Sequence, residues 1–267
     1  MPEGDTAYQA ATAIGRAFTG NTLTSSQFRV PRYATVDLAG RTVLASRSIG
    51  KHVVVDVGDD WAIHSHMKME GVWRVHPIGT RWTKPAFTAR LVLRTATHEA
   101  VGFDLGVCEM LRHPDEALAY LGPDLLGPTW DAQTAVANLG RDPARPIGLA
   151  LLDQHLMAGV GNVYRCEVCF LRGVHPHTPA GDVDLPAMVD LCRRLLLANR
   201  ARVRTTTGQT RARRYWVYGR GGRPCMRCGT AIERGFMGTP DTTEERVLYH
   251  CPRCQPAPAG LSLPSSP

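Results

Sequence analysis

The sequence predicts an α+β protein of several domains, in which a helix and an antiparallel β-sandwich precede a helical domain and a cysteine hairpin. Three observations predict it: apolar residues at helical spacing near the start and in the second half, short β-rich runs between turn residues, and two Cys-x-x-Cys pairs near the end. A chain of 267 residues with 43% hydrophobic residues is long enough for more than one core.

The first element is expected to be a helix from Glu3 to Phe18. Ala7 and Ile14 belong to an apolar series at helical spacing, and Gly20 supplies a stop signal beyond its end. The helix therefore begins almost at the N-terminus of the chain.

The part from Leu23 to Leu111 is expected to form an antiparallel sandwich or barrel. Its apolar runs are short, rich in β-branched residues, and divided by turn residues. The clearest strands are expected at Lys51–Val57, Trp61–His66, Val72–Val75 and Arg90–Arg94. Residues 1–113 then form an N-terminal domain, and the Pro- and Gly-rich stretch 114–130 is expected to be a linker.

A helical domain is expected over residues 131–220. Between two of its helices lies Met157–Asn162, whose two glycines would let backbone N–H groups approach a phosphate. Many helix connections contain glycine, so this signal alone is weak. The tail 257–267, rich in Pro, Ala and Ser, is expected to be disordered.

Two Cys-x-x-Cys pairs predict a zinc finger over residues 221–256. The pairs are separated by 22 residues and present four thiolates to one tetrahedral metal; they are Cys225, Cys228, Cys251 and Cys254. Two disulfides or four ordinary buried thiols are the alternatives, and the paired spacing favours one structural zinc ion.

A third pair, Cys166 and Cys169, has no second pair nearby. Its spacing among apolar residues is that of a helix face, so we expect both thiols to be buried in a helix. The chain shows neither a secretory signal nor a membrane-spanning run. We therefore expect a reducing, intracellular compartment and no membrane partner.

The C-terminal part carries the positive charge. Residues 200–256 hold twelve Arg against four acidic residues, a net of +8 in a chain whose total is +7. A cluster of positive charges beside a zinc hairpin predicts binding to a polyanion, and the backbone of DNA or RNA is the obvious polyanion. The alternative is a solvated basic face, although an ordinary surface would mix charges of both signs.

Several short motifs lie in a fixed order along nearly the whole chain. They are Pro2-Glu3-Gly4, Gly50-Lys51, His64-Ser65-His66 leading to Met69–Val75, Leu151–Gln154 with Ala158–Tyr164, Val217–Arg220, and Cys251–Gln255. Together they resemble the formamidopyrimidine-DNA glycosylase and endonuclease VIII family of base-excision repair enzymes. The resemblance implies a helix-two-turn-helix within the helical domain, a monomer, and a bacterial, cytoplasmic protein associated with the nucleoid.

The resemblance also implies the catalytic residues. Once Met1 is removed, Pro2 exposes a secondary amine that can attack the anomeric carbon of a damaged nucleoside and form an iminium. Glu3 is then the proton shuttle. By the same resemblance Lys51 contacts the phosphate beside the lesion, although as an isolated residue it would be a solvated strand-edge lysine. The carboxylate that some family members carry at position 6 is replaced by Thr6.

Three further residues match the DNA contacts of the family. Met69 matches the wedge that fills the space left by a flipped base, with a core methionine as the alternative. Asn162 and the amides around it match the binding site for the phosphates that flank the lesion. Arg246 matches the arginine that the zinc hairpin directs at the DNA backbone.

One loop bears on which damaged base is removed. Family members that excise oxidised purines carry an Arg-Phe pair in a loop that we expect at Phe103–Leu111, and this chain lacks the pair. We therefore expect removal of oxidised pyrimidines from double-stranded DNA, with single-stranded DNA as a further candidate substrate, followed by β,δ-elimination. The alternatives are an oxidised-purine glycosylase, a non-catalytic zinc-finger DNA-binding protein, and an enzyme that uses an N-terminal proline on small molecules.

Overall fold

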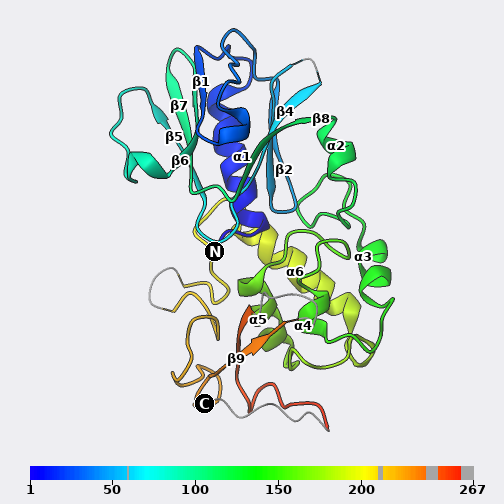
Figure 1. The fold of residues 1–267 in the computed structure, drawn as a ribbon. Helices are drawn as coiled ribbons and strands as arrows, with labels where there is room; N and C mark the ends of the chain where they lie inside the picture. The colour runs from blue at the N-terminus through cyan, green and yellow to red at the C-terminus, as the bar shows by residue number, and fades with distance from the viewer. Residues whose placement is uncertain (59, 210–212, 239–245, 260–267) are drawn as a thin grey trace. The chain divides into compact units, whose positions relative to one another are not determined.

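The computed structural model describes residues 1–267 except 59, 210–212, 239–245 and 260–267 (Figure 1). The chain forms two compact units, Met1–Tyr120 and Leu121–Pro267. Within the described ranges, no helix has the length and apolar character that a membrane span requires. Most of the tail expected to be disordered, residues 260–267, lies outside the described residues.

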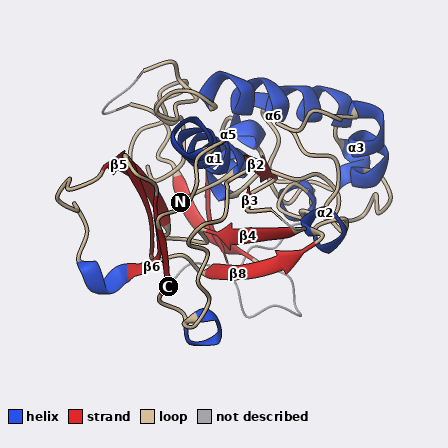
Figure 2. Cartoon of the chain, turned by 90° about the horizontal axis from the view of Figure 1, so that it is seen from above, coloured by secondary structure: helices blue, strands red, loops and turns tan. Residues whose placement is uncertain are grey.

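The first unit is a sandwich of two antiparallel four-stranded sheets, ordered β1-β6-β7-β5 and β2-β3-β4-β8, as the fold class predicts (Figures 1 and 2). The elements are α1 (Gly4–Phe18), β1 (Ser25–Phe28), η1 (Pro31–Tyr33), β2 (Ala45–Ile49), β3 (His52–Asp56), β4 (Trp61–His66), β5 (Val72–Pro77), η2 (Ala86–Thr88), β6 (Ala89–Arg94), β7 (His98–Phe103), β8 (Val107–Arg112) and α2 (Pro114–Ala117).

Helix α1 packs against both sheets. Its buried residues Ile14 and Phe18 belong to the same hydrophobic core as Val53 of β3 and Leu91 of β6. Burial of each such large side chain contributes about 1.5–3 kcal/mol to stability. The core therefore fixes the N-terminal end of the chain to the sandwich.

The expected strands differ from the observed ones at one point that bears on function. The segment expected as a loop, Phe103–Leu111, is mostly strand: Phe103 ends β7, β8 begins at Val107, and only Asp104–Gly106 turn between them. The mixed composition of β8 hides it in the sequence. It forms because it pairs with β4 along its whole length, which shows that tertiary pairing overrides local β-propensity here.

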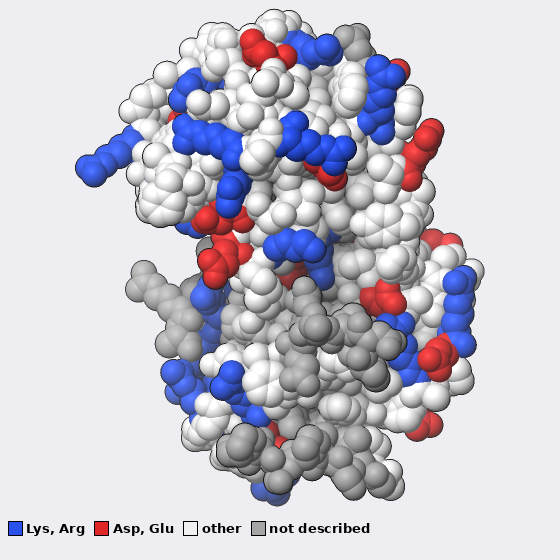
Figure 3. All heavy atoms as spheres, viewed as in Figure 1, with Lys and Arg blue, Asp and Glu red and all other residues white. Residues whose placement is uncertain are grey.

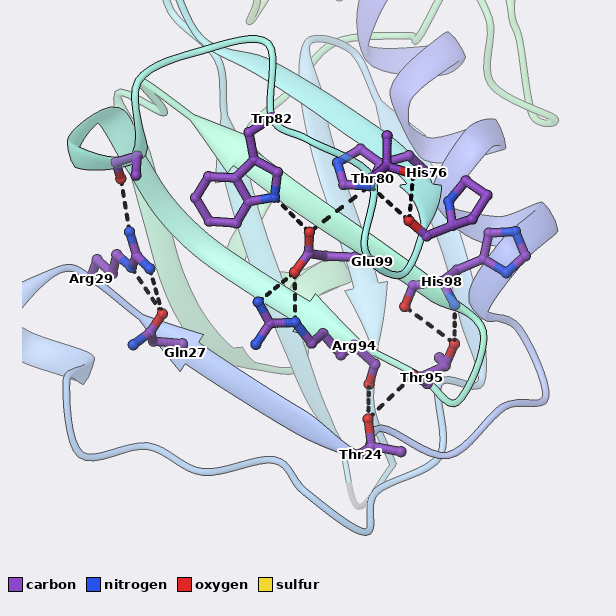
Figure 4. A network of polar contacts seen from close by, with 12 residues as sticks. Thr24, Gln27, Arg29, His76, Thr80, Trp82, Arg94, Thr95, His98 and Glu99 are labelled. Atoms are coloured by element: carbon purple, nitrogen blue, oxygen red, sulfur yellow. Dashed lines mark hydrogen bonds and ion pairs between the residues drawn. The ribbon is translucent and has the colours of Figure 1, made fainter.

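A polar network fixes the segment between β5 and β6 (Figure 4). The buried carboxylate of Glu99 accepts hydrogen bonds from Trp82 Nε1 at 2.6 Å and from Arg94 Nε at 2.6 Å. Arg29 Nη1 donates to the carbonyl oxygen of Ala86 at 2.8 Å. The segment is therefore tied to the rest of the unit at Trp82 and at Ala86.

The second unit is helical, with a two-stranded hairpin near its end. Its elements are α3 (Ala132–Leu139), α4 (Ile147–Ala150), α5 (Asn162–Arg172), η3 (Ala180–Asp182), α6 (Leu185–Asn199), β9 (Glu233–Met237) and β10 (Arg246–His250). Asp131 caps α3 by accepting hydrogen bonds from two backbone N–H groups, and Asp184 caps α6 by accepting one. Cys166 and Cys169 lie fully buried in α5, as expected.

Candidate active site and metal centre

Two carboxylates are buried where α1 begins. Glu3 is 1% exposed and occupies the N-cap position, where its carbonyl oxygen accepts hydrogen bonds from the N–H groups of Thr6 and Ala7, both at 3.0 Å. Asp5 is equally buried and accepts the Thr6 N–H at 2.7 Å. The helix N-terminus carries a partial positive charge that favours such anions. The buried state of Asp5, two residues after Glu3, was not foreseen from the sequence.

Lys51 lies in the two-residue turn between β2 and β3. Ile49 pairs with His52, so Gly50 and Lys51 are the two central residues of the hairpin. Gly50 has φ +58, a conformation that favours glycine at the first central position. The half-buried Lys51 side chain therefore extends from the tip of a tight hairpin.

Met69 lies at the tip of the turn between β4 and β5. Its side chain is 53% exposed, whereas Met67 is 1% exposed and belongs to the sandwich core. The turn is tight: a Cβ on Gly71 would lie 2.4 Å from the carbonyl oxygen of Met67. The structure thus separates a core methionine from an exposed one within three residues.

Asn162 is the first residue of α5 and is 3% exposed. Its Nδ2 donates to the carbonyl oxygen of Val247 in β10 at 2.8 Å, and its Oδ1 accepts a hydrogen bond from Arg165. The side chain therefore connects the start of α5 to the hairpin. Sequence reasoning missed this connection because the partner lies 85 residues further along the chain.

Glu167 organises the segment that follows the helices. Its carboxylate accepts the backbone N–H groups of Trp216, Val217 and Tyr218 at 2.8, 2.9 and 2.8 Å, and the hydroxyl of Thr206. Burial raises the pKa of Glu167, and these hydrogen bonds oppose the rise. The signal in the sequence for this role was the position of Glu167, a charged residue among the apolar residues of α5.

The four cysteines of the two pairs meet at one point. All four sulfur atoms lie within 4.8 Å of one another, with Cys225 and Cys254 at 4.0 Å and Cys228 and Cys251 at 3.5 Å. Sulfur ligands at about 2.3 Å from a tetrahedral metal lie about 3.8 Å apart, so the cluster fits one ion.

A bound ion would change the protonation of the cluster. Hydrogen bonds from Thr230 lower the pKa of the Cys228 thiol to about 6. Burial, and then the neighbouring thiols, raises the pKa of Cys254 to about 12. Several adjacent thiolates repel one another, and a divalent cation removes that penalty.

The cysteine cluster is anchored to the helical part of its unit. Gln255 accepts the N–H of Cys251 and donates to the carbonyl oxygen of Val174, both at 2.9 Å. Strand β10 pairs with β9 from Arg246 to His250. The Arg246 side chain lies outside the described part of the structure.

Several arginines of the positively charged part of the chain, residues 200–256, lie over aromatic rings. The guanidinium carbons are 4.5 to 5.6 Å from the ring centroids in the pairs Arg227–Phe170, Arg204–Tyr164, Arg234–Phe236 and Arg214–Tyr215. Such contacts hold a cation in place at little desolvation cost. On the face drawn in Figure 3, Lys and Arg side chains lie in several groups with acidic side chains among them.

Two family models match the chain. The formamidopyrimidine-DNA glycosylase N-terminal domain matches residues 1–105, and the formamidopyrimidine-DNA glycosylase H2TH domain matches residues 121–212. Among solved structures, the chain shares its fold with Lactococcus lactis Fpg (MutM) in complex with an oxidized pyrimidine containing DNA. The TM-score is 0.79 at 23% identity, covering 96% of this chain and 100% of that one.

Relatives cover nearly the whole chain. "Probable endonuclease 8 2" of Streptomyces coelicolor is 50% identical over 97% of this chain and 95% of its own length. "DNA-(apurinic or apyrimidinic site) lyase Nei2" of Mycolicibacterium smegmatis is 51% identical over 96% and 100%. "Endonuclease 8" of Escherichia coli is 31% identical over 96% and 100%. The chain therefore belongs to the formamidopyrimidine-DNA glycosylase family, in its endonuclease 8 branch.

Proposed function

We propose that the protein is a bifunctional DNA glycosylase and AP lyase of base-excision repair that removes oxidised pyrimidines through a Schiff base on Pro2. The observation that carries the proposal is the buried carboxylate of Glu3 directly behind Pro2, at the start of α1, in a member of this family. The glycosylase and lyase class is also supported by the relatives named endonuclease 8 and Nei2.

The N-terminal unit supplies the chemistry. After removal of Met1, the Pro2 amine attacks C1′ of the damaged nucleoside and loses its proton, while the C1′–N bond to the base breaks and the base leaves with a proton. Glu3 protonates the sugar ring oxygen, the C1′–O bond of the ring breaks, and the iminium forms between Pro2 and C1′. Glu3 later assists β,δ-elimination of the phosphates. Lys51, at its rigid hairpin tip, contacts the phosphate beside the lesion.

The DNA contacts are divided between the two units. Met69, exposed at a tight turn, is the wedge that fills the space left by the flipped base. Residues 131–220 and 221–256 hold the phosphate backbone through the amides around Asn162 and through Arg246. Because the Asn162 side chain is already hydrogen bonded inside its unit, its role is to orient those amides.

The cysteine cluster is proposed to hold one structural Zn²⁺. The reason is its set of four sulfur ligands at tetrahedral spacing, which leaves no open coordination position for catalysis. When bound, the ion supplies folding free energy to the hairpin. We propose further that the protein acts as a cytoplasmic monomer on double-stranded and single-stranded damaged DNA.

The proposed preference for oxidised pyrimidines rests on the turn between β7 and β8. Asp104–Gly106 is only a three-residue connection and carries no Arg-Phe pair. A Cβ on Gly106 would lie 2.2 Å from Cγ of Lys68, so the turn is packed against the neighbouring Met69 turn. It offers no extended loop for recognising an oxidised purine.

Borohydride reduction in the presence of abasic-site DNA tests the function. A covalent protein–DNA adduct is expected from the processed protein. Binding without an adduct would indicate a non-catalytic zinc-finger protein, and neither binding nor adduct would indicate a small-molecule enzyme. The variant Glu3→Gln should lose base excision but keep cleavage of pre-formed abasic sites, which already lack the base.

A further inference from the structure

A chain of hydrogen bonds crosses the sheet β2-β3-β4-β8 on the face turned away from the sandwich core. Val53 and Val55 belong to that core, so His52 points to the opposite face of β3. His64 on β4 and Glu109 on β8 lie on the same face as His52 because of the strand register. Helix α2 packs against β4 and β8.

The contacts are short and continuous. Glu109 Oε1 lies 2.8 Å from His64 Nδ1, and His64 Nε2 lies 2.7 Å from His52 Nδ1. The hydroxyl of Tyr120 completes the chain at 3.4 Å from His52 Nε2. The two imidazole rings stack with centroids 5.0 Å apart, and both are buried.

The carboxylate at one end sets the tautomers of both rings. The Glu109 carboxylate can only accept, so His64 carries its proton on Nδ1 and presents a lone pair on Nε2. His52 must then donate from Nδ1 and present its own lone pair on Nε2. Burial, followed by the charges of nearby histidine and lysine side chains, lowers the pKa of His52 to about 3, so this ring is uncharged at neutral pH.

His52 supports two loops that the proposed function uses. It directly follows Lys51 at the tip of the β2–β3 hairpin. The ring of His52 also contacts the ring of His66 edge-on, with centroids 4.8 Å apart. His66 accepts the backbone N–H of Lys68 on Nδ1 at 2.9 Å, and so fixes the start of the turn that carries Met69.

We propose that Glu109, His64 and His52 form a relay of positioning residues, two of them buried, that holds Lys51 and the Met69 turn in one geometry for strand cleavage. The proposal rests on the function proposed above. A displacement of either loop moves the phosphate contact relative to the Pro2 amine, and small misplacements of reacting groups lower the rate of a chemical step strongly.

Two variants of Glu109 test the relay. Glu109→Ala removes the acceptor from His64, and single-turnover cleavage of an abasic-site duplex should fall about tenfold, while the Kd for undamaged duplex changes less than about twofold. Glu109→Gln keeps an acceptor oxygen for His64 Nδ1 and should restore the rate to within about twofold. Glu116→Ala, which removes an exposed carboxylate from α2, is the matched control.

A spectroscopic readout tests the relay without reference to activity. In the ¹⁵N-labelled full chain at pH 7.5, long-range ¹H–¹⁵N correlations should show His52 and His64 protonated on Nδ1, and His66 protonated on Nε2. Glu109→Ala should change the His64 and His52 signals and leave those of His175 in the other unit unchanged. A wild-type His52 or His64 protonated on Nε2 overturns the relay.

The two proposals fail in different ways. Absence of cleavage by the wild-type protein contradicts the proposed function, and the tautomers still report on the relay. Cleavage by wild type together with an equally fast, folded Glu109→Ala protein contradicts the positioning role. A rate that falls for both Glu109 variants and for Glu116→Ala contradicts it as well, because the loss would follow charge and not the hydrogen bond to His64.

Discussion

The side chain of Asn162 donates to the carbonyl oxygen of Val247 across 2.8 Å, which joins the first turn of α5 to the strand that begins at Arg246. The donor and acceptor are both inside one compact unit. The same hydrogen bond therefore supports two proposed DNA contacts. One is made by the amides around Asn162, which are proposed to bind phosphates, and the other by Arg246, which is proposed to contact the DNA backbone. Changes at Asn162 should affect both.

Asn162→Ala should lower the free energy of unfolding of the C-terminal unit by about 1–3 kcal/mol, because Val247 and the buried Arg165 both lose a partner. Urea unfolding followed by circular dichroism measures this. Asn21→Ala, at an exposed position of the other unit, is the control. Equal stability of the Asn162 variant and wild type would contradict the structural role.

A protein that retains Met1, or carries an N-terminal tag, should bind abasic-site DNA and fail to cleave it. Iminium formation needs the lone pair of the Pro2 amine, which an amide bond delocalises. Gel analysis of cleavage, with mass spectrometry of the N-terminus, measures this. Removal of the tag by a protease that leaves Pro2 first is the control. Full cleavage by a verified Met1-retaining protein would exclude Pro2 as the nucleophile.

Removal of the metal, or Cys228→Ser, should weaken DNA binding at least about tenfold, because the hairpin loses its folding free energy. Fluorescence anisotropy with undamaged duplex measures the binding, and metal analysis gives the stoichiometry, expected to be one zinc per chain. Cys108→Ser makes the same chemical change outside the cluster and should bind normally. Tight binding and full turnover by a metal-free protein would contradict the structural role of zinc.

Met69→Ala and Arg246→Ala should differ in which DNA they affect. A lost wedge penalises the flipped state only, so Met69→Ala should lower excision from duplex about tenfold and spare single-stranded substrate. Arg246→Ala should weaken binding to damaged and undamaged duplex alike, with a salt dependence shallower by roughly one phosphate contact. Ile78→Ala, an exposed apolar position of the same unit as Met69, is the control.

Measurement of both variants on both substrates at two salt concentrations separates these roles. If Met69→Ala weakens binding to undamaged duplex as much as Arg246→Ala does, and impairs excision from single strands equally, Met69 is a packing residue.

Acid should destabilise the N-terminal unit through His52. The pKa of His52 is about 3 in the folded protein, whereas its ordinary value is 6.5. Below pH 6.5, His52 therefore binds a proton in the unfolded chain but stays unprotonated in the folded chain. Stability should fall as the pH drops from 6.5 towards 3, by up to about 1.4 kcal/mol per pH unit. His52→Phe keeps a ring but cannot take up this proton, so its loss of stability between pH 7 and pH 5 should be smaller. An equal loss would contradict the assignment.

The sequence predicts those parts of the structure that are determined by a local pattern of residues. Helix α1 is predicted because its apolar residues repeat every turn, and the metal cluster because two Cys-x-x-Cys pairs offer the four sulfur ligands of a tetrahedral ion. Strand β8 was not predicted, because it forms by pairing with β4 and its own composition does not favour a strand. The link from Glu109 through His64 to His52 was missed for the same reason: the three residues come from three strands, and only the register brings them together.

The hydrophobic core beneath the cysteine hairpin is shared. Cys166 and Phe170 of α5 pack in one cluster with Ile232, Leu248 and Cys251 of the hairpin. A chain ended before the hairpin would expose Phe170 to water and become prone to aggregation. The hairpin is therefore not an interchangeable module, and an exchange of this part between relatives would succeed only if α5 were exchanged along with it.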